Sequence, residues 1–406
     1  MDVFQQQENA LAGRIERMNR RIQVSKERDI YPFMHVSDEV DGLRVVVNGK
    51  RLIQFSSYSY LNLLGHPKIQ AESEKALKEF GTGTHGVRFL AGTTRLHVEL
   101  EQTIARFKQT EESIALPSGY VANLGVISAL MGRNDVVISD KLNHASIVDG
   151  CVLSNAKFVR FEHNDMESLE RALAEASDRY GKLVVVDAVF SMDGDIINLP
   201  EVIKLSKRYG AMIMVDEAHS LGVLGETGHG IEEHFGIEDP TLIDIKMGTM
   251  SKAIPSIGGY IAGNKELITY LKHTVRPFIF SGALPPSSAA AAKAAFEIIN
   301  DEPNRVKTLH QNQDYFIQGL RERGFNTMKT HTPIVPIVAF DEYKALKMAR
   351  LTQEDGIFSV PVLAPAVPTG TDRIRATVTA GHTFREIDLA INAFQKAGKA
   401  VGVLPK

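Results

Sequence analysis

Three residues near the middle of the chain place an acid, an imidazole and an amine close to the ends of predicted strands. Asp216 ends the apolar run 212–216, His219 follows it, and Lys252 comes shortly after the apolar run 242–247. In an open α/β sheet, ligands bind at the carboxyl edge, where these side chains would meet. Pyridoxal phosphate enzymes need a lysine for a Schiff base and a carboxylate for the pyridinium nitrogen. The carboxylate keeps that nitrogen protonated, so the ring can accept electrons from a carbanion at the substrate Cα.

A second group of residues is suited to holding a phosphate. Thr249 and Ser251 supply hydroxyl groups next to Lys252, and the segment 118–120 comes before a predicted helix over 121–131. The first N–H groups of a helix have no intrahelical partner and bind anions well. Each residue alone is more often structural than functional, so the prediction of a pyridoxal phosphate site depends on the combination.

Other motifs in the chain match known patterns only in part. Residues 81–86 read Gly-Thr-Gly-Thr-His-Gly, but a dinucleotide fingerprint needs a strand before it, and an amphipathic helical segment, 67–80, precedes it here. We therefore predict a flexible loop near a ligand. Residues 215–219 resemble an acidic box of nucleotide-hydrolysing motors, yet the sequence has no phosphate-binding G-x-x-x-x-G-K-[ST] loop. Asp216 and His219 lack further ligands nearby in the sequence, so we predict no metal site.

The elements that position these residues follow from the hydrophobic pattern. From about residue 50, short apolar runs alternate with segments of helical length, as expected for βαβ units with a parallel sheet. The predicted strands of this region are residues 136–139, 157–161, 183–187, 212–216, 242–247 and 258–262. Pro285 and Pro286 interrupt the pattern. A smaller α/β region follows, with predicted helices over 304–323, 342–355 and 384–396 and strands over 334–340 and 373–379.

These patterns predict an α/β protein in three parts. Residues 1–45 would form an N-terminal helical arm, residues 46–285 a large cofactor-binding domain with a mostly parallel sheet, and residues 286–406 a small C-terminal α/β domain. The arm carries an apolar stripe at Leu11, Ile15, Met18 and Ile22. We favour packing of this stripe on the protein body or on a second copy of the chain. Peripheral membrane contact is the alternative, because arginines at positions 14, 17, 20 and 21 lie in the same segment.

The composition excludes several classes of protein. The chain has 406 residues, of which 44% are hydrophobic and 23% charged, with a formal net charge of −3. These values fit a folded globular protein and give no reason to expect a nucleic-acid partner. A single cysteine, Cys151, cannot form an intrachain disulfide. With no secretory signal pattern and no long apolar segment, we predict a cytoplasmic protein without a transmembrane helix.

Longer stretches of the sequence resemble the α-oxoamine synthases. The stretches that carry the resemblance are residues 55–61, 82–93, 143–146, 189–195, 216–222 and 248–252. The likeness runs from about residue 44 to residue 382. It is most similar to the serine palmitoyltransferase branch, through residues 132–135, 144–150, 198–201 and 364–368. The family consists of fold-type I pyridoxal phosphate enzymes that join an amino acid to an acyl thioester with loss of carbon dioxide.

The resemblance implies a role for residues around the cofactor ring. Lys252 would form the Schiff base, Asp216 would pair with the pyridine nitrogen, and His219 would hydrogen-bond the phenolic oxygen. His144 would stack on the ring, and Ser191 would lie near the phenolic oxygen.

It also implies contacts to the phosphate and to the substrate. The backbone of Gly119 and Tyr120 and the hydroxyl of Thr249 would hold the phosphate. Arg375 would bind the substrate carboxylate, because its planar fork suits a carboxylate, and Arg373 is the competing choice.

The sequence departs from the family pattern at two places. Tyr58 and Ser59 stand where many members have Asn-Asp, and Gly282 stands where a hydroxyl residue is common. The first change resembles the Tyr-Asn of eukaryotic palmitoyltransferases, so Tyr58 is expected to contact substrate. The second change lies in a motif that the family places near the neighbouring subunit.

The activity implied by the resemblance is condensation of an amino acid, with serine favoured, with a long-chain acyl-CoA to give a 3-ketosphinganine-type product. One alternative is an α-oxoamine synthase that uses glycine or alanine with another acyl donor. A second alternative is a non-catalytic partner subunit, against which Lys252, Asp216, His219 and His144 argue. The family also implies a homodimer with active sites at the subunit interface.

Overall fold

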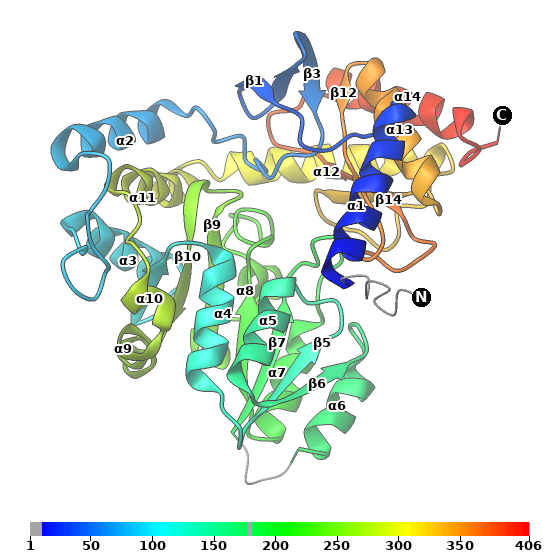
Figure 1. Cartoon of the computed structure of the whole chain (residues 1–406). Helices are drawn as coiled ribbons and strands as arrows, with labels where there is room; N and C mark the ends of the chain where they lie inside the picture. Colours follow the sequence, from blue (N-terminus) through cyan, green and yellow to red (C-terminus); the bar gives the residue numbers. More distant parts are fainter. Residues whose placement is uncertain (1–9, 177–180, 406) are drawn as a thin grey trace, which may run out of the picture.

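A seven-stranded sheet forms the centre of the chain in a computed structural model, which describes residues 10–176 and 181–405 (Figure 1). Its strands are β4 (Glu112–Leu116), β5 (Val136–Asp140), β6 (Lys157–Phe161), β7 (Lys182–Asp187), β8 (Met212–Asp216), β9 (Ile245–Ser251) and β10 (Pro255–Gly263). Their spatial order is β4-β10-β9-β8-β7-β5-β6. Neighbouring strands from β6 to β9 are parallel, and β10 runs antiparallel to both β9 and β4.

Both faces of this sheet are buried under helices. Val137 of β5 packs in one apolar cluster with α4 (Gly119–Leu130), α5 (Ala145–Ser154) and α9 (Lys265–Thr274). Val136 and Ile138 point the other way, because side chains alternate along a strand. They pack in a cluster with α2 (Pro67–Phe80), α3 (Arg95–Phe107), α6 (Met166–Ala174), α7 (Leu199–Arg208) and α11 (Pro286–Asp301). Strands buried on both faces explain the continuous apolar runs in the sequence.

A smaller region has its own sheet and its own apolar cluster. Strands β11 (Ile334–Val338), β14 (Arg373–Thr377) and β13 (Pro361–Val362) pair in that order. Helices α12 (Asn304–Glu322), α13 (Glu342–Glu354) and α14 (Phe384–Ala400) supply the apolar residues that pack against them. The last strand, β14, carries Arg373 and Arg375.

A third sheet joins the amino-terminal segment to this smaller region. It contains β1 (Ser37–Val40), β2 (Arg44–Val47), β3 (Lys50–Gln54) and β12 (Ile357–Phe358), in that order. Ile53 pairs in parallel with Ile357. The segment 55–60, which leads to the edge of the cavity described below, therefore starts from a strand that pairs with the carboxyl-terminal part of the chain.

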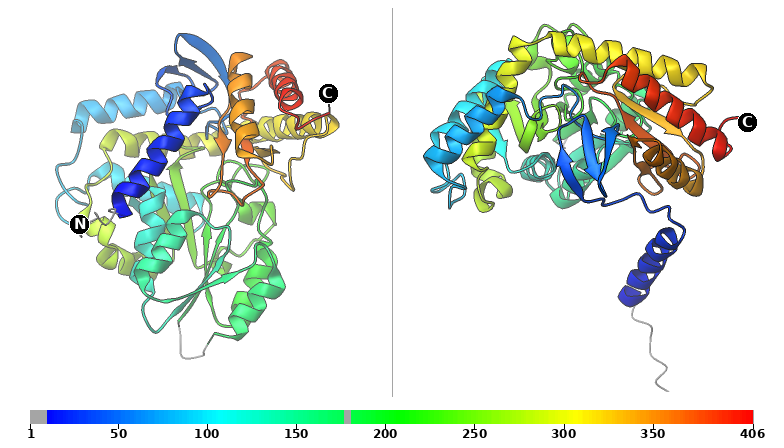
Figure 2. Two further views of the ribbon diagram at one scale, coloured as in Figure 1. Left: turned by 45° about the vertical axis from the view of Figure 1, so that its right-hand side comes forward. Right: turned by 90° about the horizontal axis from the view of Figure 1, so that it is seen from above.

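Helix α1 (Ala10–Glu27) projects from the body of the molecule (Figure 2). Arg21 forms an ion pair of 2.5 Å with Glu342 at the start of α13. The apolar residues Ile15 and Met18 are 62% and 56% exposed. The first nine residues of the predicted arm lie outside the described part of the chain. Within the described ranges, no helix is long and apolar enough to cross a membrane.

The predicted fold class is confirmed, with one strand displaced. Residues 240–242 form a short 3-10 turn, and β9 runs over Ile245–Ser251 instead of 242–247. Lys252 therefore follows the strand directly. Strands β1 to β4 were not predicted, because β4 holds only a short apolar run and β1 to β3 are partly exposed. The boundaries near residues 45 and 285 stay a prediction.

Candidate active site

A cavity of about 230 Å³ opens at the carboxyl ends of the central strands. It lies where β7, β8 and β9 end and where α4 and α5 begin, as expected for a ligand site in an open α/β sheet. The residues that line it are Ser118, Gly119, Tyr120, Asn123, His144, Ser146, Asp187, Val189, Ser191, Asp216, Ala218, His219, Met247, Thr249, Ser251 and Lys252. Tyr58 and Arg375 do not line this cavity but contact its edge, as described below.

Asp216 lies buried at the end of β8 with both carboxylate oxygens engaged. The amide of Asn123 donates a hydrogen bond of 2.7 Å to Oδ2, and the backbone N–H of Ala218 donates one of 2.9 Å to Oδ1. Asn123 also donates to Ser146 at 2.9 Å, while its own Oδ1 is buried without a protein partner. Helix α4 thus fixes the carboxylate from one side and the following loop fixes it from the other.

Lys252 contacts His219, which in turn contacts Tyr60. The distance from Lys252 Nζ to His219 Nε2 is 2.8 Å, and that from Tyr60 Oη to His219 Nδ1 is 2.7 Å. Burial and the neighbouring cation of Lys252 hold the pKa of His219 well below its usual value, and burial raises the pKa of Tyr60 to about 12.

The imidazole of His219 is therefore neutral, and its two ring nitrogens contact Tyr60 and Lys252, one as donor and the other as acceptor. Burial lowers the pKa of Lys252 to about 8, against the opposing charge of Asp216. The amine therefore reaches its neutral, nucleophilic form far more readily than an exposed lysine.

His144 and Asp187 form another wall of the cavity. His144 caps α5, and its Nδ1 accepts from the backbone N–H of Ser146 at 3.3 Å. Burial lowers the pKa of His144, which favours a neutral ring. The backbone N–H of His144 donates to Asp187 Oδ2 at 3.0 Å, whereas Asp187 Oδ1 is buried without a protein partner. Burial and the nearby Asp216 raise the pKa of Asp187 well above its usual value.

The start of α4 faces hydroxyl groups at the end of β9. Ser118 caps the helix by accepting from the N–H of Val121 at 3.2 Å, and α4 begins at Gly119. The hydroxyl groups of Thr249 and Ser251 lie 2.9 Å apart on the opposite side. A Cβ atom at Gly119 would lie 3.0 Å from Thr249 Oγ1. The glycine thus keeps open a cradle of N–H and O–H donors suited to an anion.

Two arginines on β14 differ in what they contact. Arg373 donates to Asp193 at 2.6 Å and its side chain is 1% exposed, so its charge is neutralised within the protein. Arg375 donates from Nε to the carbonyl oxygen of Ser191 at 2.6 Å and from Nη2 to Tyr60 Oη at 3.4 Å. Its guanidinium lies 4.9 Å from the centre of the Tyr58 ring, and Lys252 Nζ lies 5.8 Å from that ring. Of the two, Arg375 is therefore the one directed toward the amine.

The comparison with known proteins agrees with this arrangement. The model of the aminotransferase class I and II family matches residues 50–394. An 8-amino-7-oxononanoate synthase from Thermoanaerobacter pseudethanolicus is 43% identical over 385 residues, which cover 95% of this chain and 97% of that protein. A serine palmitoyltransferase from Sphingobacterium spiritivorum is 41% identical over 389 residues, covering 96% and 97%. The chain belongs to the α-oxoamine synthase family. A lysine-to-alanine variant of the serine palmitoyltransferase from S. paucimobilis, solved with a bound pyridoxal phosphate–myriocin aldimine, matches with a TM-score of 0.94 and 35% identity over 97% of this chain and 100% of that one.

This α-oxoamine synthase is therefore a fold-type I enzyme whose cofactor is pyridoxal phosphate, and its cavity fits that group. An amine of lowered pKa, a fixed carboxylate and a cradle of anion-binding donors surround one space. The unpartnered oxygens of Asn123 and Asp187 are buried in the same wall. Lys252 would hold the aldehyde carbon, Asp216 the ring nitrogen, and Gly119, Tyr120 and Thr249 the phosphate.

Three polar residues of this α-oxoamine synthase were missed by the sequence reasoning. Asp187 ends a predicted strand as Asp216 does, so the strand-end position was a usable signal. Asn123 is an amide within an otherwise apolar predicted helix, which is also unusual enough to detect. Tyr60 lies within the stretch 55–61 that carries the family resemblance, but nothing local predicts that the loop after β3 folds back onto His219.

Proposed function

We propose that this α-oxoamine synthase condenses serine with a long-chain acyl-CoA, with loss of carbon dioxide, to give a 3-ketosphinganine-type α-amino ketone. The reaction type is supported by the positions of three residues: Lys252 and Asp216 line one cavity, and Arg375 lies at its edge. An amine, a fixed anion and a guanidinium match the needs of an amino acid whose Cα–H bond must be broken while its carboxylate is held.

The protein side of the chemistry follows from these contacts. When bound, pyridoxal phosphate supplies the electron sink that stabilises negative charge at the amino-acid Cα. Lys252, neutral near pH 8 and above, accepts the proton from Cα and later returns it. Arg375 binds the carboxylate through its outer nitrogens, while Ser191 holds its Nε. Tyr60 holds Nδ1 of His219, which keeps Nε2 of the ring facing Lys252.

The preference for serine and a long acyl chain has two supports. One is the TM-score of 0.94 to a serine palmitoyltransferase over nearly the whole chain. The other is Tyr58, whose ring lies beside both the guanidinium of Arg375 and the amine of Lys252. The acyl donor would then contact the aromatic ring of Tyr58.

A second candidate function is supported by the relative that is 43% identical. That relative is an 8-amino-7-oxononanoate synthase, and such a product retains a carboxylate at the far end of its chain. The two candidates therefore differ in whether the acyl donor ends in an apolar or a charged group. A non-catalytic subunit is not favoured, because the amine, the anion and the imidazole are all in place.

The test is a product assay with the purified holoenzyme. Serine, alanine and glycine are each combined with palmitoyl-CoA or with an acyl-CoA that ends in a carboxylate, and the ketone is identified by mass spectrometry. The proposal expects serine with palmitoyl-CoA to give the highest kcat/KM. Preference for alanine with the charged donor would establish the second candidate, and no product with any pair would refute both.

A further inference from the structure

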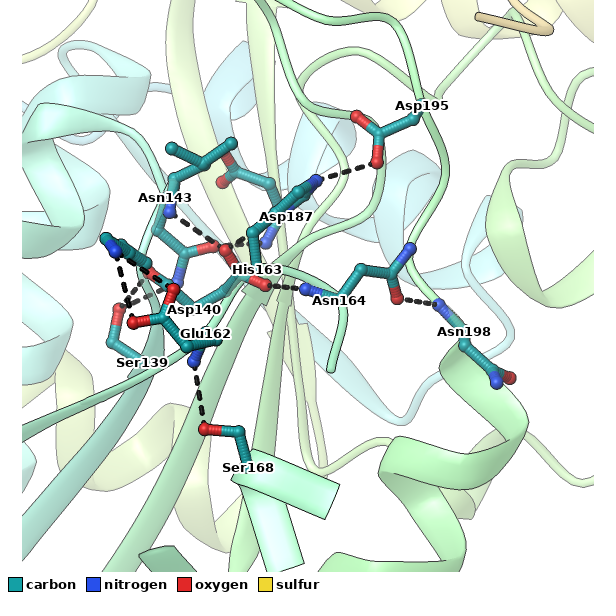
Figure 3. Close-up of polar contacts among 12 residues, drawn as sticks. Ser139, Asp140, Asn143, Glu162, His163, Asn164, Ser168, Asp187, Asp195 and Asn198 are labelled. Atoms are coloured by element: carbon teal, nitrogen blue, oxygen red, sulfur yellow. Dashed lines mark hydrogen bonds and ion pairs between the residues drawn. The ribbon is translucent and has the colours of Figure 1, made fainter. Parts of the chain in front are cut away.

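A histidine outside the cavity lies between two carboxylates (Figure 3). His163 follows β6, and its Nδ1 lies 3.0 Å from Asp140 while its Nε2 lies 2.8 Å from Asp195. Ionised carboxylates only accept hydrogen bonds, so both ring nitrogens must donate and the ring must be an imidazolium. Burial lowers the pKa of His163, but the hydrogen bonds and charges of Asp140 and Asp195 outweigh it and raise the pKa to about 10.

The two carboxylates belong to different parts of the fold. Asp140 ends β5, is buried, and also accepts from the N–H groups of Leu142 and Asn164, each at 2.8 Å. Asp195 lies in the loop 188–198, which follows β7. The imidazolium therefore ties this loop to the end of β5. Its ring also packs edge-on against Phe190 of the same loop, with centroids 4.4 Å apart.

The opposite side of the loop contacts the smaller sheet. The carbonyl oxygen of Ser191 accepts from Arg375 Nε at 2.6 Å, and Asp193 accepts from Arg373 at 2.6 Å. The carbonyl oxygen of Gly194 accepts from the hydroxyl of Thr332 at 2.9 Å. One loop thus connects the His163 pair on one side with the Arg375 guanidinium on the other.

We propose that His163 is a positioning residue for Arg375: by anchoring Asp195, it fixes the loop whose Ser191 carbonyl orients the guanidinium that receives the amino-acid carboxylate. The inference rests on the proposed function, since it takes Arg375 to be the carboxylate-binding group. It gives a role to a charged histidine that does not line the cavity. It also assigns the effect to the amino acid rather than to the cofactor or the acyl donor.

The test compares His163→Gln and Asp195→Asn with the double variant in the holoenzyme. Both single variants keep a similar shape and remove one charge of the pair. We expect the dissociation constant for the amino acid, measured by calorimetry without acyl donor, to rise about tenfold in each, equivalent to about 1.4 kcal/mol. The double variant should be no weaker than the weaker single variant, because both remove the same interaction. The cofactor dissociation constant and the KM for the acyl donor should change less than about twofold.

A second readout needs neither cofactor nor turnover. Amide hydrogen exchange of the segment 188–198 in the apoprotein should be faster in His163→Gln than in the wild type. The matched control is His234→Gln, which changes an exposed histidine on α8 (Ile231–His234). This control should alter neither exchange nor affinity.

Separate outcomes overturn the inference and the proposed function. Unchanged amino-acid affinity in His163→Gln, or an equal loss of cofactor affinity, overturns the positioning role. Arg375→Lys is measured in the same titration. If Arg375→Lys binds the amino acid normally, the carboxylate role of Arg375 is wrong and the inference falls with it. If only Arg375→Lys loses affinity, the proposed function stands and the role of His163 is wrong.

Discussion

Lys252 owes its chemistry to the residues packed around it. Burial favours the neutral amine, and the nearby guanidinium of Arg375 acts in the same direction. Asp216 partly offsets this effect and keeps the pKa of Lys252 near 8 instead of lower. A general base is most effective when its pKa lies close to the working pH.

Replacing Lys252 with alanine is expected to abolish condensation. The variant lacks both the covalent anchor and the base, so kcat/KM should fall by at least about a thousandfold. The product assay with serine and palmitoyl-CoA measures the loss. A melting temperature close to that of the wild type would show that the variant is folded. Residual turnover above about one tenth of the wild-type rate would contradict the assignment.

The pKa of Lys252 predicts how the apoprotein captures its cofactor. Only the neutral amine attacks the aldehyde, so the capture rate should rise about tenfold per pH unit below pH 8 and level off above it. Stopped-flow absorbance of the apoprotein with pyridoxal phosphate, from pH 6 to pH 10, gives the profile. A midpoint near 10, as for an exposed lysine, would refute the role of burial.

Asn123 is expected to support Asp216. Asn123→Ala removes the donor to Oδ2 and leaves a buried charge with one hydrogen bond fewer, at a cost of about 1.5–3 kcal/mol. Equilibrium dialysis should therefore find cofactor affinity reduced by about tenfold or more. Ser128→Ala, on the same helix but bonded only to the backbone carbonyls of Leu124 and Gly125, is the control. Equal affinity in both variants would contradict the role of Asn123.

At the level of elements, helix α4 combines capping with ligand binding. Ser118 satisfies one N–H group of the first turn, and Gly119 and Tyr120 at the start of the helix line the cavity together with Thr249. The absence of a side chain at Gly119 matters because β9 passes so close to the start of the helix.

Gly119→Ala is expected to weaken binding of the cofactor through its phosphate. The added Cβ would lie 3.0 Å from both Cβ and Oγ1 of Thr249, tighter than an ordinary contact. Affinity for pyridoxal phosphate should drop about tenfold, and affinity for pyridoxal, which lacks the phosphate, should change little. Gly132→Ala serves as the control, because a Cβ there would meet only Asp135 Oδ2 at 3.7 Å. An equal loss of affinity for pyridoxal phosphate and for pyridoxal would show that the substitution does not act through the phosphate.

The elements that the sequence predicts best are those with a strong local signal. Helix α2 was predicted over 67–80 and is observed as Pro67–Phe80, because a proline starts it and a glycine ends it. The strands that end at Asp216 and near Lys252 were also predicted, which brought the two residues together. Long-range contacts carry no such signal. Tyr60 reaches His219, and His163 reaches Asp195, only through the tertiary fold.

For the whole molecule, the projecting helix α1 bears on oligomeric state. Ile15 and Met18 are exposed on a helix that forms an ion pair with the body through Arg21 and Glu342. A second copy of the chain would cover such a stripe and offset the cost of exposing it.

We expect the protein to sediment as a dimer, with twice the 44.7 kDa mass of one chain. Ile15→Glu combined with Met18→Glu should shift the equilibrium toward the monomer, because burying a charge is costly. Analytical ultracentrifugation at micromolar concentration measures both, with Asn19→Glu on the same helix as the control. A wild-type monomer at all concentrations would contradict the expected homodimer.

The pairing of β3 with β12 has a consequence for synthesis on the ribosome. Ile53 cannot pair with Ile357 until that residue has been synthesised, about 300 residues later. At about 5–20 residues per second, this delay lasts about 15–60 seconds. An unpaired strand edge is a template for aggregation, and charged side chains on it reduce that danger. Lys50 and Arg51 are exposed on β3. They would keep the nascent chain from pairing with its neighbours on the same messenger RNA until its own partner strand arrives.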